Sequence, residues 1–493
     1  MDGFRRVRAA HPARAIAAVT WRPLGDSEMK RLIGGLLAVG MLLPVLLTAP
    51  VVDSGKAFAE DNGVGQKPAM GWSSWSFYGH DPTLHAVETQ AKAMVHQGLK
   101  KAGYTYVLVD DFWYVCPGSQ GPDVGRYGHW VINTSRFPNQ GKLNGIEALA
   151  RYVHHLGLKF GLYVTPGISK QAVAKDTRIE RTSYRADQIA TTAPEANYNC
   201  GGMVGIDYAK PGAQAFINSW ADEFASWGVD YLKIDGVGSG DIADVKAWSK
   251  ALRQTGRPIY FGLSNSLSIK DAATWKRFSN SWRTGHDINC YCGPPSANSG
   301  PAFAYPLTIW YWVQTRFDEV AQWAPCGGPG AYNDLDSLEL GNGVHDGLTP
   351  AMRQASMSLW ALASSPLILG ADLTHLNTLD RTYLLNRSVI SVDQDGVDAR
   401  RVFDGSSSQV FAKTERNGNV VVGLFNTSGT PEVVSTTARS LGLSTKGTYE
   451  LTNLWTHHAA PLSNSTIAAG VPPEGVVLYG IRKVAAASRS GSA

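Results

Sequence analysis

Cysteine is scarce in this chain. It occurs five times in 493 residues, at Cys116, Cys200, Cys290, Cys292 and Cys326. The closest pair, Cys290-x-Cys292, lacks the spacing of zinc ligands and has no matching Cys/His pair nearby, so we expect no structural metal. For an exported chain, five cysteines predict one or two disulfides and one remaining thiol, with a connectivity that spacing leaves open.

An excess of charge of one sign is also lacking. Charged residues make up 17% of the chain, and the formal net charge is +4. Eight of the 45 Lys and Arg residues and four of the 41 Asp and Glu residues lie in residues 1–59, so the rest carries 37 of each sign. A nearly neutral protein has no electrostatic reason to bind nucleic acid, and we expect none as a partner.

Only one long apolar run is present, from Leu32 to Val52, and it follows Lys30 and Arg31. The segment Ala57-Phe58-Ala59 then provides an A-x-A cleavage signal. This pattern predicts a leader in residues 1–59, with a signal peptide, cleavage after Ala59 and secretion of the mature protein. The run is long for a signal peptide, so an uncleaved anchor is the alternative. After cleavage we expect no membrane association.

The rest of the chain has the composition of a large globular protein, with 44% hydrophobic residues, 15 Trp and 19 Tyr. Its length favours two domains. From residue 70 to 373, short apolar runs alternate with amphipathic helical segments, which indicates parallel α/β architecture. The predicted strands lie within residues 70–75, 104–113, 158–166, 229–236, 257–265, 281–288, a short segment near Tyr332, and 366–372.

Eight strands with intervening helices predict a (β/α)8 TIM barrel, which we assign to residues 67–392. Helical segments are expected at residues 83–102, 145–156, 213–227 and 349–364. Gly103, Gly157 and Gly228 each follow a helical segment, and a glycine in this position commonly ends a helix in the left-handed conformation. The alternative is an open doubly wound sheet, but no G-x-G-x-x-G follows the first strand, which disfavours it.

After about residue 394 the pattern changes to short strand-like runs separated by turns such as Asn417-Gly418. We therefore expect a small antiparallel β-sandwich in residues 393–484. The tail at residues 485–493 is rich in Ala, Ser and Gly and is predicted to be disordered. The predicted strands of the sandwich lie within residues 410–413, 420–424, 447–453 and 475–481.

Carboxylates follow several predicted barrel strands, at the edge where TIM barrels carry their chemistry. They are Asp110, Asp111, Asp235, Asp287 and Asp336. A single acidic residue in such a place can be the N-cap of the next helix. Agreement among four strand ends instead predicts one shared pocket.

Two of these carboxylates have different sequence neighbours. Lys233 lies two residues before Asp235, on the same face of the strand, where an ammonium group is expected to lower the pKa of the aspartate. Asp287 follows Trp282 and Arg283, and an aromatic, partly dry setting is expected to raise its pKa. An ionised nucleophile beside a proton donor is typical of glycoside hydrolysis.

Six ordered motifs, covering nearly all of the chain after about Lys67, resemble glycoside hydrolase family 27, the family of α-galactosidases and α-N-acetylgalactosaminidases. They are Gly71-Trp72-Ser-Ser-Trp75, Val109-Asp110-Asp111-x-Trp113, Tyr231-Leu-Lys-Ile-Asp235, Trp282-Arg283-x-x-x-Asp287, Asn333-Asp334-x-Asp336-x-Leu338-Glu339-x-Gly341-Asn342 and Ser365-Pro366-Leu-Ile-Leu-Gly370.

The resemblance implies a role for each matching residue. Asp235 resembles the nucleophile and Asp287 the general acid/base. The substrate-binding residues it implies are Trp72 as a wall against the sugar ring, Asp110 and Asp111 at O4 and O6, Lys233 at O3 and O4, and Tyr163, Cys200, Arg283 and Asp336 at pocket-lining positions. For Tyr163 and Cys200, simple packing is the alternative. No cofactor or metal is implied.

The sequence departs from the family pattern around the sugar. Val237 replaces a cysteine that often pairs with the Cys200-like position, so that disulfide must be absent or rewired. The strand ending at Asn265 lacks a glutamate found near O2 in many members, and residues 169–198 form a long insertion. Phe112 and Thr165 also differ, standing where many members have Cys and Asp.

The predicted activity is retaining hydrolysis of terminal α-D-galactose from an oligosaccharide or polysaccharide. The alternatives are a β-L-arabinopyranosidase or an isomaltodextranase using the same site. A carbohydrate-binding protein without turnover is a further alternative, although it would not need two such carboxylates.

Overall fold

The computed structural model describes residues 62–292, 305–461 and 466–483. The predicted leader at residues 1–59 and the predicted disordered tail at 485–493 lie outside these ranges. Across the described ranges, no helix combines the length and the apolar character needed to cross a bilayer.

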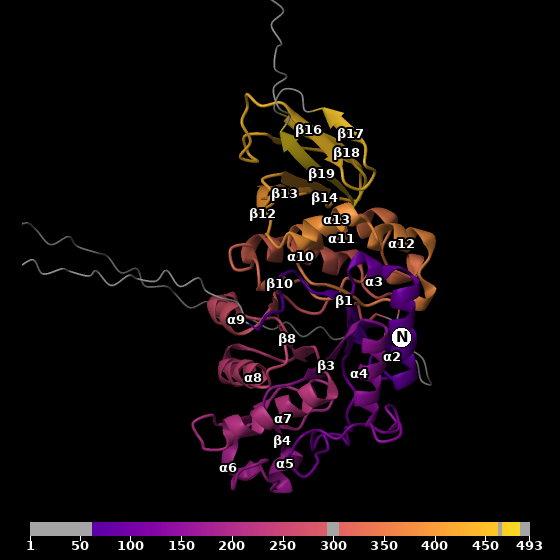
Figure 1. Ribbon diagram of the computed structural model, residues 1–493. Coiled ribbons are helices and arrows are strands. Elements are labelled where there is room, and N and C mark those ends of the chain that lie inside the picture. The colour runs from indigo at the N-terminus through magenta and orange to yellow at the C-terminus, as the bar shows by residue number, and fades with distance from the viewer. Residues whose placement is uncertain (1–61, 293–304, 462–465, 484–493) are drawn as a thin grey trace, which may run out of the picture. The chain divides into compact units, whose positions relative to one another are not determined.

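Eight parallel strands form the central sheet, in the order β10-β9-β8-β7-β3-β2-β1-β11. Figure 1 labels β1, β3, β8 and β10 of this sheet. A parallel bridge joins Leu338, in the segment after β10, to Leu369 of β11, so the two ends of the sheet meet in a barrel, which excludes the open doubly wound alternative. Each of the eight predicted segments contains one strand, so the barrel prediction is confirmed. The strands are β1 (Met70–Ser73), β2 (Tyr106–Val109), β3 (Lys159–Val164), β7 (Tyr231–Ile234), β8 (Tyr260–Leu263), β9 (Ser281–Arg283), β10 (Tyr332–Asp334) and β11 (Leu367–Leu369).

Local sequence explains why these elements form. Most of the barrel strands are buried along their whole length, as expected where helices cover the outer face of a parallel sheet. The three predicted glycine C-caps all have positive φ, at 120° for Gly103, 69° for Gly157 and 88° for Gly228. Larger residues rarely adopt this conformation, so each glycine turns the chain from a helix into the next strand.

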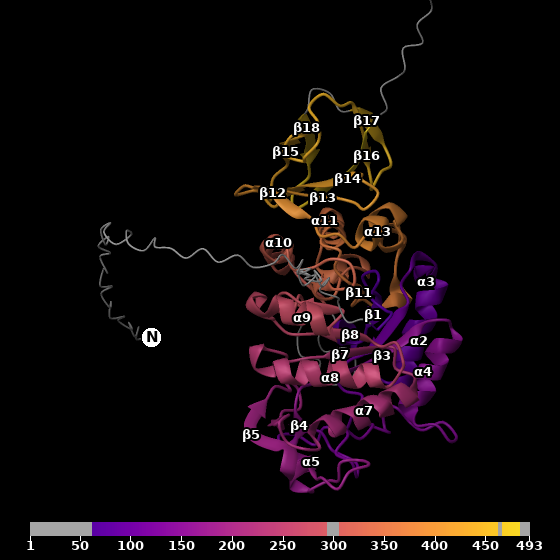
Figure 2. The same ribbon diagram turned by 60° about the vertical axis from the view of Figure 1, so that its left-hand side comes forward.

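Helices lie outside the barrel, with α7, α8 and α9 beside β7 and β8 (Figure 2). The predicted segment at 83–102 is split in two because Gly98, with φ of 84°, interrupts it. The helices of the barrel include α2 (Leu84–His96), α3 (Leu99–Ala102), α4 (Gly145–His155), α7 (Ala213–Trp227), α8 (Ile242–Gln254), α9 (Ala272–Phe278), α10 (Trp310–Trp323), α11 (Pro350–Leu362), α12 (Thr378–Leu384) and α13 (Arg387–Gln394).

The long insertion after β3 has its own structure. It forms a three-stranded antiparallel sheet of β4 (Ile168–Ser169), β6 (Met203–Ile206) and β5 (Ala190–Glu195), with two short helices, α5 (Lys170–Ala174) and α6 (Ala186–Ile189). The connection from β5 to β6 carries Tyr198, Asn199 and Cys200. This insertion therefore supplies residues to the region where the functional site lies.

The C-terminal part is antiparallel, as predicted for a β-sandwich. One sheet has the order β12-β13-β14-β19-β16-β17, and β15 and β18 form a second, two-stranded sheet. All four predicted strands are present. The two-stranded sheet was not predicted, because its apolar residues do not follow its buried face: Val433 is exposed, whereas Thr436 is buried. The strands are β12 (Arg400–Asp404), β13 (Ser408–Thr414), β14 (Val420–Asn426), β15 (Glu432–Thr437), β16 (Tyr449–Asn453), β17 (Ala459–Pro461), β18 (Thr466–Val471) and β19 (Val476–Lys483).

Candidate active site

A cavity of about 240 Å³ lies at the carboxyl ends of the barrel strands. Six of the ten predicted site residues line it: Asp110, Lys233, Asp235, Arg283, Asp287 and Asp336. They come from β2, β7, β9 and the segment after β10, so residues far apart in the sequence meet in one place. The remaining lining residues are Ser73, Trp75, His80, Tyr198, Asn199, Asn289, Tyr291 and Ser337.

Asp235 and Asp287 open into this same cavity from different strands. Asp235 directly follows β7 and is half-buried, and its backbone N–H donates to Val164 O at 2.8 Å. Asp287 lies four residues after the end of β9, and 47% of its side chain is exposed. Both carboxylates are therefore accessible from one pocket, as a pair acting on a single bond must be.

Lys233 pairs with Asp110. Its Nζ donates to Asp110 Oδ2 at 2.8 Å, and Ser74 Oγ accepts from the backbone N–H of Asp110 at 3.0 Å. Burial alone would lower the pKa of Lys233, but the charges of Asp110 and Asp235 raise it well above its ordinary value. The hydrogen bond of Lys233 therefore goes to Asp110, while its charge also interacts with that of Asp235.

Arg283 connects two carboxylates across the cavity. Its Nη2 lies 2.9 Å from Asp287 Oδ1, and its Nη1 lies 3.0 Å from Asp336 Oδ1. Asp336 is also held by the backbone N–H of Ile288, which donates to Oδ2 at 2.8 Å. The guanidinium group is almost fully buried, so its position is set by these partners and it keeps Asp287 in a defined orientation.

The pKa of Asp287 is opposite to the sequence-based expectation. Burial would raise the pKa of this carboxyl, but the charge of Arg283, a hydrogen bond from Tyr291 and one from Arg283 lower it to about 2. Trp282, expected to create an aromatic setting, is fully buried and does not line the cavity. The neighbouring Arg283 faces Asp287 instead, so in the free protein Asp287 is an ionised carboxylate.

Trp72 does not form a wall of the cavity. It is fully buried, and its Nε1–H donates to Ala371 O at 2.8 Å, next to β11. Trp75, three residues later, lines the cavity as the first residue of the short helix α1 (Trp75–Tyr78). The prediction for Trp72 is therefore wrong: the change from strand to helix after Ser73 brings the second tryptophan of the motif to the pocket.

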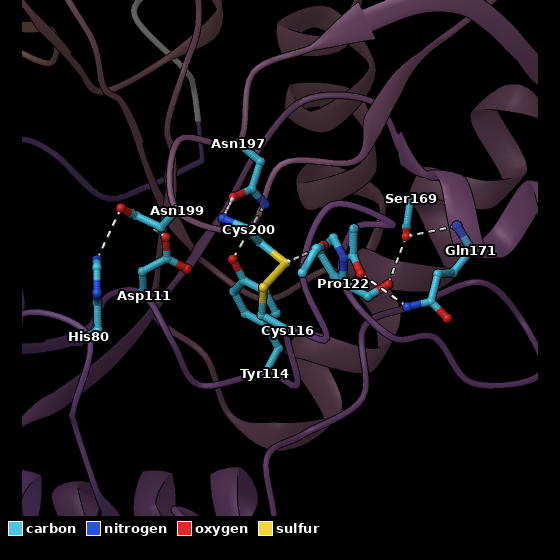
Figure 3. The surroundings of a disulfide bond; sticks show 12 residues. His80, Asp111, Tyr114, Cys116, Pro122, Ser169, Gln171, Asn197, Asn199 and Cys200 are labelled. Atoms are coloured by element: carbon cyan, nitrogen blue, oxygen red, sulfur yellow. Dashed lines mark hydrogen bonds between the residues drawn. A yellow bond between two sulfur atoms is a disulfide. The ribbon is translucent and has the colours of Figure 1, made fainter.

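Three other predicted residues lie behind the wall. Asp111 is fully buried, and its Oδ2 accepts a hydrogen bond from Asn199 Nδ2 at 2.7 Å (Figure 3). Asn199 lines the cavity, whereas Asp111 does not. Burial raises the pKa of Asp111 to about 7. Tyr163 is also buried, and its ring centroid lies 5.6 Å from Lys233 Nζ. Cys200 is occupied in a disulfide, so for Tyr163 and Cys200 the packing alternative describes this structure better.

Cys200 pairs with Cys116, with a separation of 84 positions along the chain. This bond joins the loop after β2 to the connection between β5 and β6, immediately beside Asn199 (Figure 3). The expected loss or rewiring of the family disulfide is thus seen as a new pairing. Cys290 lies beside Cys292, and Cys326 is a free thiol.

Several lining residues were missed by sequence reasoning, mainly Tyr198, Asn199, His80, Asn289 and Tyr291. Asn199 Oδ1 lies 3.1 Å from His80 Nε2, so this asparagine links His80 to Asp111. These residues lie in loops rather than at strand ends, where no periodicity marks them. The one available signal was the position of Tyr198 and Asn199 directly before Cys200.

Removal of the Cys116–Cys200 disulfide is expected to destabilise the protein by about 2–5 kcal/mol, because the bond closes a long loop in the unfolded chain. Cys116→Ser, Cys200→Ser and the double variant should show similar losses in the free energy of unfolding, measured by urea denaturation under oxidising conditions. Cys326→Ser, which breaks no disulfide, is the control. Additive losses in the double variant would contradict the pairing.

In the described ranges, no group of three or more His, Cys, Asp or Glu side chains is arranged to hold a metal ion. The chemical groups that the cavity offers are carboxylates, one ammonium, one guanidinium, one imidazole, hydroxyls, amides and aromatic rings. Such a set suits hydrogen bonding to a polyhydroxylated ligand and acid/base chemistry on it.

Comparison with known families gives two matches in chain order. Residues 67–190 and 197–395 match a family model described as alpha galactosidase A. Residues 405–481 match one described as alpha galactosidase C-terminal beta sandwich domain. The gap between the first two segments falls inside the insertion, just before Tyr198.

Individual proteins that resemble this chain agree with the two family matches. An alpha-galactosidase of Cyamopsis tetragonoloba is 31% identical over 432 residues, covering 86% of this chain and 88% of the relative. Among solved structures, a GH27 β-L-arabinopyranosidase of Geobacillus stearothermophilus matches with a TM-score of 0.75 and 29% identity, covering 86% of this chain and 98% of that one. Alpha-galactosidase I of Mortierella vinacea matches with a TM-score of 0.67 and 26% identity, covering 87% and 100%. The chain belongs to glycoside hydrolase family 27.

Proposed function

We propose that this protein is a retaining α-galactosidase that hydrolyses terminal α-D-galactosyl residues of oligosaccharides or polysaccharides. The observation that carries the proposal is the meeting of Asp235 and Asp287, from separate barrel strands, in one 240 Å³ cavity. The curated relatives named as alpha-galactosidases support the choice of galactose.

The proposed reaction has two displacements at the anomeric carbon. In the first, Asp235 attacks this carbon, the glycosidic bond breaks, and Asp287 gives its proton to the leaving oxygen. In the second, Asp287 removes a proton from water, the water oxygen bonds to the anomeric carbon, and the ester to Asp235 breaks. Two inversions leave the configuration of the sugar unchanged.

Asp287 must gain a proton before the first step. In the free protein, Arg283 and Tyr291 keep the pKa of Asp287 near 2, although burial works in the opposite direction. A bound substrate would cover the exposed half of this side chain and remove it from water. Desolvation of this kind disfavours the charged form, so the pKa should rise when substrate binds.

The Asp110–Lys233 pair in the cavity fits a sugar with closely spaced hydroxyls. The Asp110–Lys233 pair offers an acceptor and a donor to neighbouring hydroxyl groups, which suits the axial O4 of galactose and the groups beside it. Asp111 would act through Asn199 rather than directly, because that asparagine occupies the cavity wall.

β-L-Arabinopyranoside hydrolysis is the second candidate, because the family 27 β-L-arabinopyranosidase structure matches this chain with a TM-score of 0.75. Its sugar has the ring configuration of α-D-galactose without the C6 hydroxymethyl group. Discrimination therefore depends on contacts with C6 and O6 alone.

Hydrolysis of a panel of nitrophenyl glycosides tests both candidates. We expect kcat/KM for the α-D-galactoside to exceed that for the β-L-arabinopyranoside by at least about 10-fold, since a site that binds the extra group discriminates on this scale. NMR of the fresh product should show α-galactose first. Preference for the arabinopyranoside or for an α-1,6-glucan would reassign the substrate, and initial β-galactose would exclude the retaining mechanism.

Secretion after cleavage at Ala59 is part of the same proposal, and it is supported by the apolar leader and by the disulfide between Cys116 and Cys200. We also propose the domain limits 67–392 for the barrel and 393–484 for the sandwich. N-terminal sequencing of the secreted protein and limited proteolysis would check these assignments.

A further inference from the structure

Tyr291 contacts the carboxylate of Asp287 directly. Its hydroxyl oxygen lies 2.6 Å from Asp287 Oδ2, while Asp287 Oδ1 is held by Arg283 Nη2 at 2.9 Å. Both oxygens of Asp287 are thus engaged by donors. Tyr291 lies outside the sequence motifs that identify the family, in the loop after β9, and 42% of its surface is exposed.

A second contact holds the Tyr291 hydroxyl group. Trp75 Nε1 lies 2.8 Å from the Tyr291 hydroxyl oxygen, and an indole N–H can only donate. The tyrosine oxygen accepts from Trp75, and its own O–H donates to Asp287 Oδ2, because an ionised carboxylate can only accept. The chain of donors runs from Trp75 through Tyr291 to Asp287 Oδ2.

We propose that Tyr291, oriented by Trp75, is a positioning residue that holds Asp287 and biases it toward the ionised form used in the second step of the reaction. The inference rests on the proposed function, because it assigns a step to Asp287. A donor aimed at a carboxylate stabilises its charged form over its neutral form.

The two oxygens of Asp287 have different tasks under this arrangement. Arg283 remains a donor at any working pH, so Oδ1 cannot readily carry the catalytic proton. Oδ2 therefore receives the proton of the attacking water, as the water oxygen bonds to the anomeric carbon and the Asp235 ester breaks. By assisting the charged form, Tyr291 favours this deglycosylation step at the expense of proton donation in the first step.

Other ionisable groups also act on Asp287. Arg283 and Lys233 favour its charged form, from β9 and β7. Further titratable groups of the same cavity are Asp235 after β7, Asp336 after β10, Asp110 after β2, His80 after α1 and Tyr198 after β5. Tyr291→Phe leaves all of these in place and removes a single hydroxyl group.

The test is the pH profile of Tyr291→Phe beside that of the wild type. One hydrogen bond to a charged group corresponds to a shift of about one pH unit. With a substrate whose poor leaving group makes the first step limiting, the basic limb of kcat, where Asp287 in the bound complex loses the proton needed for that step, should move up by about this amount. With an activated aryl galactoside whose leaving group needs no acid, the acidic limb of kcat should also move up, because ionised Asp287 is needed in deglycosylation.

Tyr198→Phe is the matched control, since it makes the same change on the same cavity at a residue whose hydroxyl interacts with Asn265. The acidic and basic limbs of its pH profiles should lie at the same pH values as those of the wild type. If Tyr291→Phe loses activity but keeps the wild-type limbs, Tyr291 has only a structural role and the inference is overturned. A wild-type protein without activity on any glycoside of the panel overturns the proposed function and this inference together.

Discussion

Asp235→Ala is expected to reduce kcat on nitrophenyl α-galactoside by on the order of 10⁴-fold or more, the scale that follows when a member of a catalytic unit is removed. The variant has no carboxylate to form the glycosyl ester, so the first displacement cannot proceed. Asp187→Ala, which removes an exposed carboxylate that does not line the cavity, should retain wild-type activity.

Adding azide to the Asp235→Ala variant tests whether the lost residue is the nucleophile. In Asp235→Ala the deleted side chain leaves space on the face of the sugar opposite the leaving group, where azide can attack. A single displacement then gives β-galactosyl azide, which NMR distinguishes from the α anomer. Full activity without azide, or an α-azide product, would show that Asp235 is not the nucleophile.

Asp287→Ala is expected to lose about 10²- to 10⁴-fold in kcat/KM on substrates with poor leaving groups, the usual contribution of general acid/base catalysis. The loss should be much smaller for an activated aryl galactoside, because its leaving group departs without a proton. For such a substrate the second step becomes limiting, since no base activates water, and the glycosyl-enzyme accumulates as a burst of released phenol.

Azide should restore turnover of the activated substrate by Asp287→Ala, because an anion needs no base to attack. The product should be α-galactosyl azide, formed by two displacements. Opposite azide anomers from the two variants would assign the nucleophile and the acid/base separately. Equal loss on all leaving groups would instead place Asp287 in substrate binding.

Most of the fold could be predicted from the sequence. Each of the eight barrel strands lies within a predicted segment, because a short apolar run between a glycine C-cap and a polar strand end is a local pattern. The two-stranded sheet of β15 and β18 was missed because the apolar and polar residues of its strands do not match its buried and exposed positions, as exposed Val433 and buried Thr436 show. Local periodicity therefore accounts for both outcomes.

The site was predictable only in part. Six predicted residues line the cavity, since carboxyl ends of parallel strands converge in a barrel. The choice of Trp72 over Trp75 failed because it depends on where β1 gives way to α1. The pKa of Asp287 was misjudged because both Trp282 and Arg283 precede it in the sequence. Of these two residues, only Arg283 contacts the carboxylate, whereas Trp282 is buried.

The sequence by itself determined the order of strands and helices, the antiparallel C-terminal part and the acidic residues at the strand ends. These features depend on sterics and hydrophobic periodicity among neighbouring residues. Only the tertiary structure decided that Lys233 binds Asp110, that Cys200 joins Cys116, and that Tyr291 reaches Asp287. Such contacts depend on distances and directions between loops of different elements, and no local pattern along the chain encodes them.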